Sequence, residues 1–219
     1  MYQGSSKEFL FHGWRKIKER AVGGITSLNL SLTSHGWLPI LFIFQSLKNP
    51  LKIAAILPSS ATLARNMVKI LRKNPVETVV ELGAGTGSIT AEILQNLPQT
   101  GLVYCFEING EFCTALADRF KADKRLKILK DSAVEFASHL QAKQADIVFS
   151  ALPFTGIPAK ERDKMIEAIK HGLKPGGFYV QIVYSMLPYL KLKKEFSNVQ
   201  VAFVLWNIPP AFIFICRNV

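Results

Sequence analysis

The segment from Glu81 to Thr90 constrains the fold more than any other part of the chain. It reads Glu-Leu-Gly-Ala-Gly-Thr-Gly-Ser-Ile-Thr and follows the apolar run at 78–80. This order predicts a buried strand that enters a glycine-rich turn, after which an amphipathic helix begins. Glycine reaches positive φ without a Cβ penalty, and it lets a ligand lie directly on the backbone. Because the first N–H groups of the helix are free, we expect the turn to bind a ligand.

A second acidic residue indicates which ligand the turn binds. Glu107 ends the second predicted strand, at 102–107. A carboxylate about 20 residues beyond the glycines, at the tip of strand 2, can accept hydrogen bonds from ribose hydroxyls. The glycines lack the sixth-position glycine of the dinucleotide fingerprint, and Glu81 precedes them. The pattern resembles motif I of S-adenosylmethionine-dependent methyltransferases rather than an NAD site. The alternative, a glycine turn without a ligand, is disfavoured by Glu107.

The resemblance to motif I implies S-adenosylmethionine as the cofactor and a defined set of binding residues. Asp131 and Ser132 follow the third predicted strand. A carboxylate there can accept a hydrogen bond from the exocyclic amine of adenine, and a backbone N–H can reach a ring nitrogen. Asp131 is also a good helix cap, and both roles can hold. The expected cofactor-binding residues are Glu81, Gly83, Ala84, Gly85, Gly87, Glu107, Ile108, Asp131, Ser132 and Ser150.

Strands and helices alternate along the chain from Lys52 onwards. The alternation predicts an α/β fold with a seven-stranded, mostly parallel sheet and an antiparallel C-terminal strand pair. Together with the resemblance to motif I, it implies a Rossmann-like class I methyltransferase. The carboxyl ends of the strands would place Glu81, Glu107, Asp131 and Ser150 on one rim. The expected strands are 78–82, 102–107, 126–129, 147–150, 178–184, 199–206 and 211–216. The expected helices are 61–73, 88–96, 110–120, 134–140, 160–171 and 191–196, with a closing turn at 174–177.

The segment at 150–154, Ser-Ala-Leu-Pro-Phe, lies where methyltransferases place the methyl acceptor. Enzymes that methylate N6 of adenine begin this motif with Asn or Asp. Ser150 stands there in this chain, and a hydroxyl cannot reproduce the donor–acceptor pair of an amide, which disfavours a nucleic-acid substrate. Phe154 is either a ring that stacks on the acceptor or a core aromatic. The candidate catalytic residues are Ser150, which can align an amine, and Tyr184, a polar group near the acceptor or else a core tyrosine.

Residues 1–50 differ in pattern from the rest of the chain. We expect them to form an N-terminal amphipathic, membrane-interacting extension, with the methyltransferase domain at 51–219. Residues 7–22 fit a helix in which Trp14 lies on an apolar stripe flanked by Lys and Arg, a pattern typical of interfacial helices. An ordinary helix packed on the domain is the alternative. A cap for the helix at 61–73 is expected from Ser59 or Ser60.

The charge of the chain favours an anionic partner. Lys and Arg outnumber Asp and Glu by 27 to 16, which gives a net charge of +11. Such a surface attracts nucleic acid or an anionic membrane face. The apolar run at 37–44 is too short to span a bilayer, and no secretory signal is recognised. The cysteines and histidines show no metal-ligand spacing, so we expect no metal, and no feature predicts a protein partner.

Several segments together resemble the bacterial phospholipid N-methyltransferases, which methylate phosphatidylethanolamine toward phosphatidylcholine. The resemblance implies a phospholipid substrate and a cytoplasmic enzyme that is peripheral on the inner face of a bacterial cell membrane. Two alternatives stay open: an adenine N-methyltransferase acting on ribosomal RNA or another nucleic acid, and a non-catalytic, membrane-associated S-adenosylmethionine-binding protein. The segments that carry the resemblance are Pro50, 54–60, 63–65, 81–87, 150–153, 173–177, Gln181, Tyr184 and 206–211.

Overall fold

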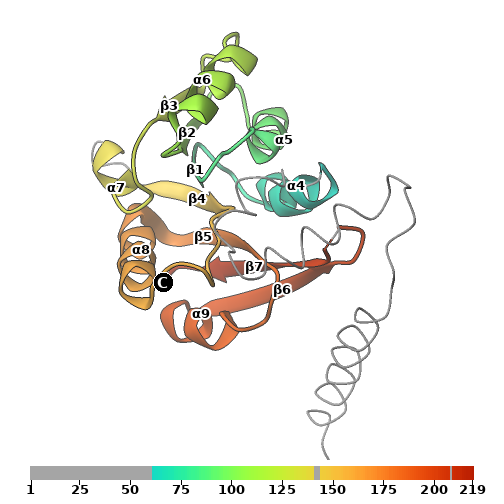
Figure 1. The fold of residues 1–219 in the computed structure, drawn as a ribbon, viewed down its shortest axis with the longest axis vertical. Coiled ribbons are helices and arrows are strands. Elements are labelled where there is room, and N and C mark those ends of the chain that lie inside the picture. Colours follow the sequence, from blue (N-terminus) through green and yellow to red (C-terminus); the bar gives the residue numbers. More distant parts are fainter. Residues whose placement is uncertain (1–60, 141–143, 208) are drawn as a thin grey trace, which may run out of the picture. The chain divides into compact units, whose positions relative to one another are not determined.

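The computed structural model describes residues 61–140, 144–207 and 209–219. Within these ranges, seven strands form one sheet in the order β3-β2-β1-β4-β5-β7-β6 (Figure 1). Strands β1 to β5 run parallel to one another, whereas β7 is antiparallel to both β5 and β6. The predicted α/β fold with an antiparallel C-terminal pair is therefore confirmed. The strands are β1 Thr78–Leu82, β2 Leu102–Phe106, β3 Leu126–Leu129, β4 Ala145–Ser150, β5 Leu173–Val183, β6 Asn198–Val204 and β7 Ala211–Arg217.

The helices alternate with these strands, as the sequence predicts. The expected helix at 61–73 is an α-helix in its first half and a tighter 3-10 helix in its second half. The helices are α4 Ala61–Met67, η1 Val68–Lys73, α5 Ser88–Asn96, α6 Gly110–Arg119, α7 Phe136–His139, α8 Ala159–Gly172 and α9 Tyr189–Glu195. No helix in the described ranges has the length and apolar character needed to cross a bilayer. The predicted helix at 7–22, the Ser59 or Ser60 cap and the extension at 1–50 lie outside the described residues.

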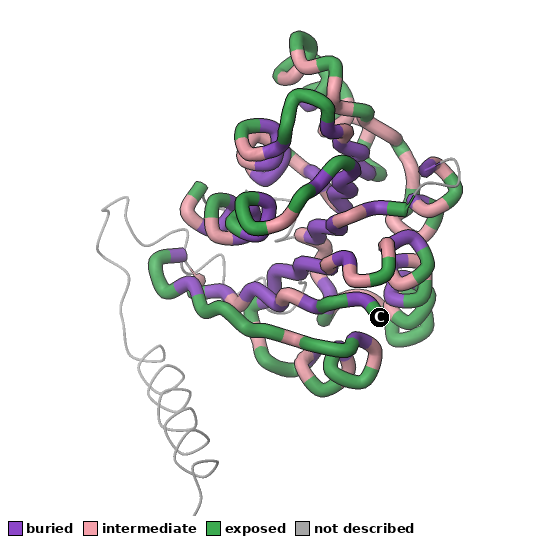
Figure 2. Tube along the Cα trace, turned by 180° about the vertical axis from the view of Figure 1, so that it is seen from behind, coloured by how far each residue is buried: buried purple, intermediate pink, exposed green. Residues whose placement is uncertain are grey.

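Alternating side chains along each strand supply two separate cores, one on each face of the sheet. Val79 packs with α4, α5 and α6, whereas its neighbour Val80 packs on the opposite face with α7, α8 and α9. Figure 2 shows the central strands as buried segments between helices with exposed outer surfaces, whereas the edge strand β6 is mostly exposed. Helices cover both faces, so the central strands read as continuous apolar runs, and this is why the sequence alone located them.

Four neighbouring strands reach the same level at their carboxyl ends. Leu82 is paired with Phe106 on one side and with Ser150 on the other, and Ser150 is paired with Gln181. The loops that follow these residues therefore leave the sheet at one edge, where open α/β sheets bind their ligands. We call this edge the carboxyl edge.

The start of β5 differs from the prediction. The segment at 174–177 was expected to close the preceding helix, but it forms the first part of β5, which begins at Leu173. Gly176 has a φ of 78°, and the pairing between β4 and β5 shifts register between Ala145 and Ile147. A positive φ lets the strand accommodate this irregularity, so the Pro-Gly-Gly signal marks a local distortion within the strand.

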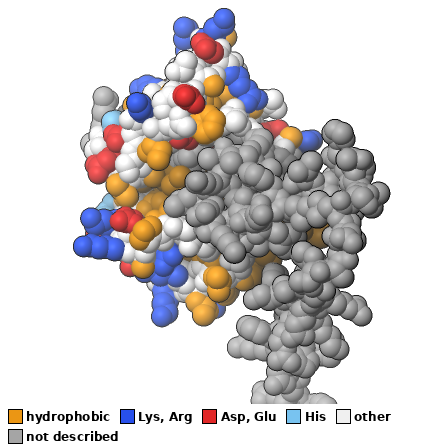
Figure 3. All heavy atoms as spheres, viewed as in Figure 1, with side chains coloured by type: hydrophobic (Ala, Val, Ile, Leu, Met, Phe, Trp, Pro, Cys, Tyr) orange, Lys and Arg blue, Asp and Glu red, His pale blue; other side chains and the backbone are white. Residues whose placement is uncertain are grey.

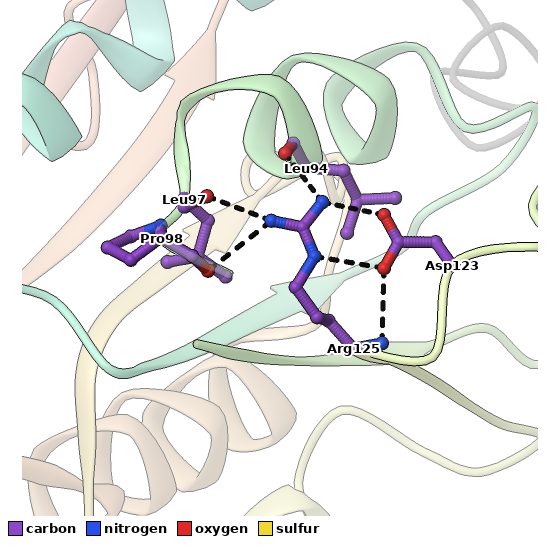
Figure 4. Close-up of polar contacts among 5 residues, drawn as sticks. All are labelled: Leu94, Leu97, Pro98, Asp123 and Arg125. Carbon is purple, nitrogen blue, oxygen red and sulfur yellow. Dashed lines mark hydrogen bonds and ion pairs between the residues drawn. The ribbon is translucent and has the colours of Figure 1, made fainter. Parts of the chain in front are cut away.

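Arg125 fixes the far end of the helix that follows the glycine turn (Figure 4). Its guanidinium donates hydrogen bonds to the carbonyls of Leu94 and Leu97, both at 2.8 Å, near the carboxyl end of α5. It also forms a 2.6 Å ion pair with Asp123. The carbonyls at a helix carboxyl end lack helical partners and carry partial negative charge, so a partly buried cation stabilises α5 there.

Candidate active site

The glycine turn between β1 and α5 leaves one open position. A Cβ atom at Gly83 would lie 2.7 Å from Cδ2 of Leu152, and one at Gly87 would lie 2.7 Å from Cδ2 of Leu116. Both glycines therefore allow close packing within the protein. Gly85, with a φ of 53°, has no heavy atom of the described residues within 4 Å of the corresponding point. The backbone at Gly85 is thus exposed to the space in which a ligand can lie.

Glu107 is held against this turn by backbone N–H groups. Its Oε2 accepts a 2.9 Å hydrogen bond from Gly85, and its Oε1 accepts one of 2.9 Å from Asn109. The side chain of Asn109 in turn accepts from Glu111 and caps α6. A carboxylate has about four acceptor positions, so two remain for ribose hydroxyls. Asn109 was not predicted; its signal is an N-cap residue two positions after the acidic residue.

Glu81 lies buried beneath the same turn and carries an unsatisfied oxygen. Its Oε2 accepts hydrogen bonds from Oγ1 of Thr90 at 2.7 Å and from Sγ of Cys105 at 3.1 Å. Its Oε1 is buried without a hydrogen-bond partner among the described residues. Burial raises the pKa of Glu81 to about 6, the hydrogen bonds from Thr90 and Cys105 oppose the rise, and the charge of Glu107 adds to it. An unpartnered carboxylate oxygen favours a cationic hydrogen-bond donor from a ligand.

These features fit S-adenosylmethionine. The molecule carries a sulfonium, an ammonium group and ribose hydroxyls. Glu81 offers a free carboxylate oxygen, Glu107 offers fixed acceptors, and Gly85 offers backbone without a side chain. Ala84 is buried within the turn, and its carbonyl accepts a 2.9 Å hydrogen bond from the N–H of Gly87.

Asp131 and Ser132 follow β3, but Asp131 already has partners. Its Oδ2 lies 2.7 Å from Nε2 of His139, and its Oδ1 accepts a 2.7 Å hydrogen bond from the N–H of Ser132. The hydrogen bond with His139 is the main reason that the pKa of Asp131 is lowered. The alternative role as a helix cap is wrong, because Glu135 is the N-cap residue of α7. The contact of Asp131 with adenine stays a prediction. The contact of Ile108 with the cofactor also stays a prediction; this residue follows Glu107 and is 74% exposed.

Ser150 is fully buried at the end of β4, where it shapes the acceptor loop. Its Oγ accepts a 3.3 Å hydrogen bond from the N–H of Leu152, and the carbonyl of Leu152 accepts one of 3.0 Å from Gln181. Tyr179 donates to Oε1 of Gln181 and also interacts with Ser150. This buried network was not predicted, although Tyr179 and Gln181 lie at alternating positions of β5. A direct contact between Ser150 and the cofactor or acceptor stays a prediction.

The two aromatic candidates near the acceptor loop have different surroundings. Phe154 is a core residue, only 2% exposed, and the guanidinium of Arg162 lies 5.6 Å from its ring centre. Tyr184 follows β5 and is 52% exposed. Desolvation of its hydroxyl raises the pKa of Tyr184, and a hydrogen bond with Asn207 opposes the rise.

The fold and the glycine turn with its two carboxylates define an S-adenosylmethionine-dependent methyltransferase of the Rossmann-like class. Residues 79–177 match the family described as "Methyltransferase domain". A solved structure, the N-methyltransferase NodS from Bradyrhizobium japonicum, is similar in fold with a TM-score of 0.58 and 12% identity, over 70% of this chain and 93% of that one. S-adenosylmethionine is therefore the cofactor, as predicted.

Two relatives of known name are similar to this chain in sequence, over different shares of its length. The ornithine lipid N-methyltransferase of Singulisphaera acidiphila is 31% identical over 183 residues, which cover 82% of this chain and 95% of that enzyme. The chain belongs to the same methyltransferase family as that enzyme. Ribosomal RNA small subunit methyltransferase A of Persephonella marina is 35% identical over 72 residues, which cover 33% of this chain and 26% of that protein.

Proposed function

We propose that this methyltransferase transfers methyl groups to the amine headgroup of a membrane lipid. The similarity to an ornithine lipid N-methyltransferase over 95% of that enzyme's length carries the proposal. The segments at 150–153 and 206–211, which resemble phospholipid N-methyltransferases, support it independently. The similarity to the ribosomal RNA enzyme is confined to a third of this chain. We infer that the protein works as a peripheral enzyme at the inner face of a bacterial membrane.

Two headgroups carry the amine that such chemistry requires. Phosphatidylethanolamine, methylated toward phosphatidylcholine, is favoured by the resemblance of the acceptor loop and of the β6–β7 connection. Ornithine lipid is favoured by the curated relative. Both present an amine at the end of a headgroup that stays anchored in the bilayer.

The residues of the site divide the reaction between them. When bound, S-adenosylmethionine supplies an electrophilic methyl group on a sulfonium. Glu107 and the backbone at Gly85 orient the cofactor. This orientation raises the reaction rate because it holds the methyl group close to the acceptor amine. Ser150 holds the acceptor loop through Leu152. The raised pKa of Tyr184 keeps its hydroxyl protonated at neutral pH, so its oxygen can accept a hydrogen bond from the amine but does not act as a phenolate base.

The experiment is a transfer assay with methyl-labelled S-adenosylmethionine. The purified full-length chain is incubated with vesicles that contain phosphatidylethanolamine, ornithine lipid or phosphatidylglycerol, and separately with total RNA. We expect label in one or both amine lipids and none in phosphatidylglycerol, which lacks an amine. Label in RNA alone would replace the proposal by the nucleic-acid alternative. Cofactor binding without label in any fraction would favour a non-catalytic protein.

A further inference from the structure

Large apolar side chains are exposed on two loops and on the helix that follows one of them. Leu187 is 83% exposed, Trp206 85% and Leu190 70%. Leu187 precedes α9, Leu190 lies in its first turn, and Trp206 lies between β6 and β7. Met186 and Leu205 are exposed beside them. We call these five residues the apolar tip. Isolated apolar residues on a surface need no explanation, but several that face solvent together indicate an interaction site.

The apolar tip lies at the carboxyl edge, the edge that carries the cofactor site. The loop with Leu187 follows the carboxyl end of β5, which runs parallel to β4. β7 is antiparallel to both β5 and β6, so β6 runs in the same direction as β5 and its following loop leaves at the same edge. A hydrogen bond between Tyr184 and Asn207 joins the two loops. The apolar tip therefore borders the region where the acceptor must approach.

Two lysines without a carboxylate partner among the described residues lie one helical turn behind this tip; one of them, Lys193, has its Nζ 5.8 Å from the ring centre of Tyr189. Leu190, Lys193 and Lys194 are spaced i, i+3 and i+4 along α9, so they share one exposed face of the helix. Lys191 is paired with acidic side chains, whereas Lys193 and Lys194 have no carboxylate partner among the described residues. Figure 3 shows lysine and arginine side chains next to hydrophobic ones over the region where Figure 1 places α9 and β6.

This order of side chains fits a bilayer better than it fits a protein. A membrane surface offers an apolar interior and, about one helical turn further out, anionic phosphates. Leucine and tryptophan at the tip would enter the interior, while Lys193 and Lys194 extend toward the phosphates. Tryptophan is also the residue enriched at the boundary between lipid and water. The net charge of +11 acts in the same direction.

We propose that the apolar tip inserts into an anionic bilayer and turns the carboxyl edge toward it. The inference deepens the proposed function and rests on it for its consequence: a lipid amine could reach the cofactor while its acyl chains stay in the membrane. The five residues of the apolar tip differ from those of the membrane contact predicted for the segment at 7–22, which includes Trp14. The cofactor residues Glu81 and Glu107 are not part of the tip.

Tryptophan fluorescence tests the insertion directly. The full chain has three tryptophans, so Trp14→Phe with Trp37→Phe leaves Trp206 as the only one. On mixing with vesicles of phosphatidylglycerol and phosphatidylcholine, we expect its emission to shift to shorter wavelength. Brominated acyl chains should quench it. Vesicle-bound protein whose Trp206 emission neither shifts nor is quenched would overturn the proposal.

Co-sedimentation in the native background gives a second measurement. Leu187→Glu with Trp206→Glu should reduce partitioning onto anionic vesicles at least about tenfold, because two large apolar side chains lose their burial. The affinity for S-adenosylmethionine without lipid should stay unchanged. Val219→Glu is the matched control, since Val219 is 82% exposed after β7 at the opposite edge. Equal sedimentation of the double variant and the wild type would refute the insertion.

The two proposals fail in different ways. If Trp206 is quenched but no lipid takes up methyl label, the proposed function falls and the membrane surface stands. If lipid is labelled while Trp206 remains in water, the surface proposal falls and the function stands. A double variant that does not fold leaves the decision to the fluorescence measurement, which uses no charged substitution.

Discussion

Replacing Glu81 with glutamine tests the electrostatics beneath the glycine turn. Burial raises the pKa of this carboxyl from 4.5 to about 6. Between these values the folded protein holds a proton that the unfolded chain releases, so the free energy of unfolding falls as the pH rises through the window. The two pKa values differ by an amount that corresponds to about 2 kcal/mol, and this loss is complete above the folded-state pKa. Glutamine cannot ionise, so the Glu81→Gln variant does not lose this free energy of unfolding as the pH rises.

Urea unfolding of the cofactor-free proteins measures this effect. The stability of Glu81→Gln relative to wild type should increase by about 2 kcal/mol from acid pH to neutral pH. The amide of glutamine also brings buried N–H donors that lack acceptors, but this cost does not depend on pH and cancels in the comparison. Glu167→Gln, on the exposed surface of α8, is the control for the same substitution at the protein surface. A stability difference that is constant across pH would refute the raised pKa.

The same variant should bind the cofactor more weakly. The buried Oε1 of Glu81 has no partner among the described residues, and we expect it to accept a hydrogen bond from a cationic group of S-adenosylmethionine. Exchanging a charge-assisted hydrogen bond for a neutral one should cost about 1.5 kcal/mol, or roughly tenfold in affinity. Calorimetric titration at neutral pH gives the number. Unchanged affinity would mean that the cofactor does not form a hydrogen bond with Oε1 of Glu81.

Three further predictions, two of them with a comparison variant, address the glycine turn, the ribose contact and the carboxyl end of α5. Gly85→Ala should lower cofactor affinity at least about tenfold while the protein still folds, whereas Gly83→Ala, also at positive φ, should reduce the melting temperature more because its Cβ meets a leucine methyl at 2.7 Å. Glu107→Ala should weaken S-adenosylmethionine binding by roughly 2–4 kcal/mol, and a change below about threefold in titration would exclude it as the ribose ligand. Arg125→Met should lower the free energy of unfolding in urea by roughly 2–4 kcal/mol, since it leaves the partly buried carbonyls of Leu94 and Leu97 without their donor and Asp123 with only the backbone N–H of residue 125. Arg72→Met, which removes one exposed hydrogen bond to a side chain, should cost under about 1 kcal/mol.

The sequence located most of the sheet because each buried strand is bounded by strong local signals. β1 and α5 occur where they were predicted, since an apolar run ends at glycines whose positions only a turn explains. The prediction failed where a local signal had two meanings. Pro-Gly-Gly usually ends an element, but at Gly176 the same residues provide a distortion inside β5. Only the pairing of β5 with β4 distinguishes a Pro-Gly-Gly that ends an element from one that lies inside a strand. The residues near Gly176 in the sequence do not determine this pairing by themselves.

The site shows the same division between local and non-local information. The proximity of Glu107 to the glycine turn followed from the rule that parallel strands end at one edge. The pairing of Asp131 with His139 and the buried contacts of Ser150 could not be predicted, because they join side chains from different elements. That Oε1 of Glu81 has no hydrogen-bond partner among the described residues likewise cannot be predicted from the sequence, because it depends on every residue that surrounds this oxygen.

Tyr184→Phe distinguishes a residue that orients the amine from one that removes its proton. The pKa of Tyr184 is raised, so the hydroxyl stays protonated at neutral pH and the amine must lose its proton to solvent or another group. The variant should therefore lower kcat/KM for lipid roughly 10²-fold, while the pH at which activity is half-maximal stays the same. Affinity for S-adenosylmethionine should not change, because the hydroxyl bonds to Asn207 rather than to the glycine turn. If the rising limb of the pH profile shifts or disappears in Tyr184→Phe, the tyrosine takes part in proton transfer and the orienting role is wrong. If kcat/KM is unchanged, Tyr184 does not contact the acceptor, and the buried hydroxyl of Ser150 becomes the remaining candidate for alignment.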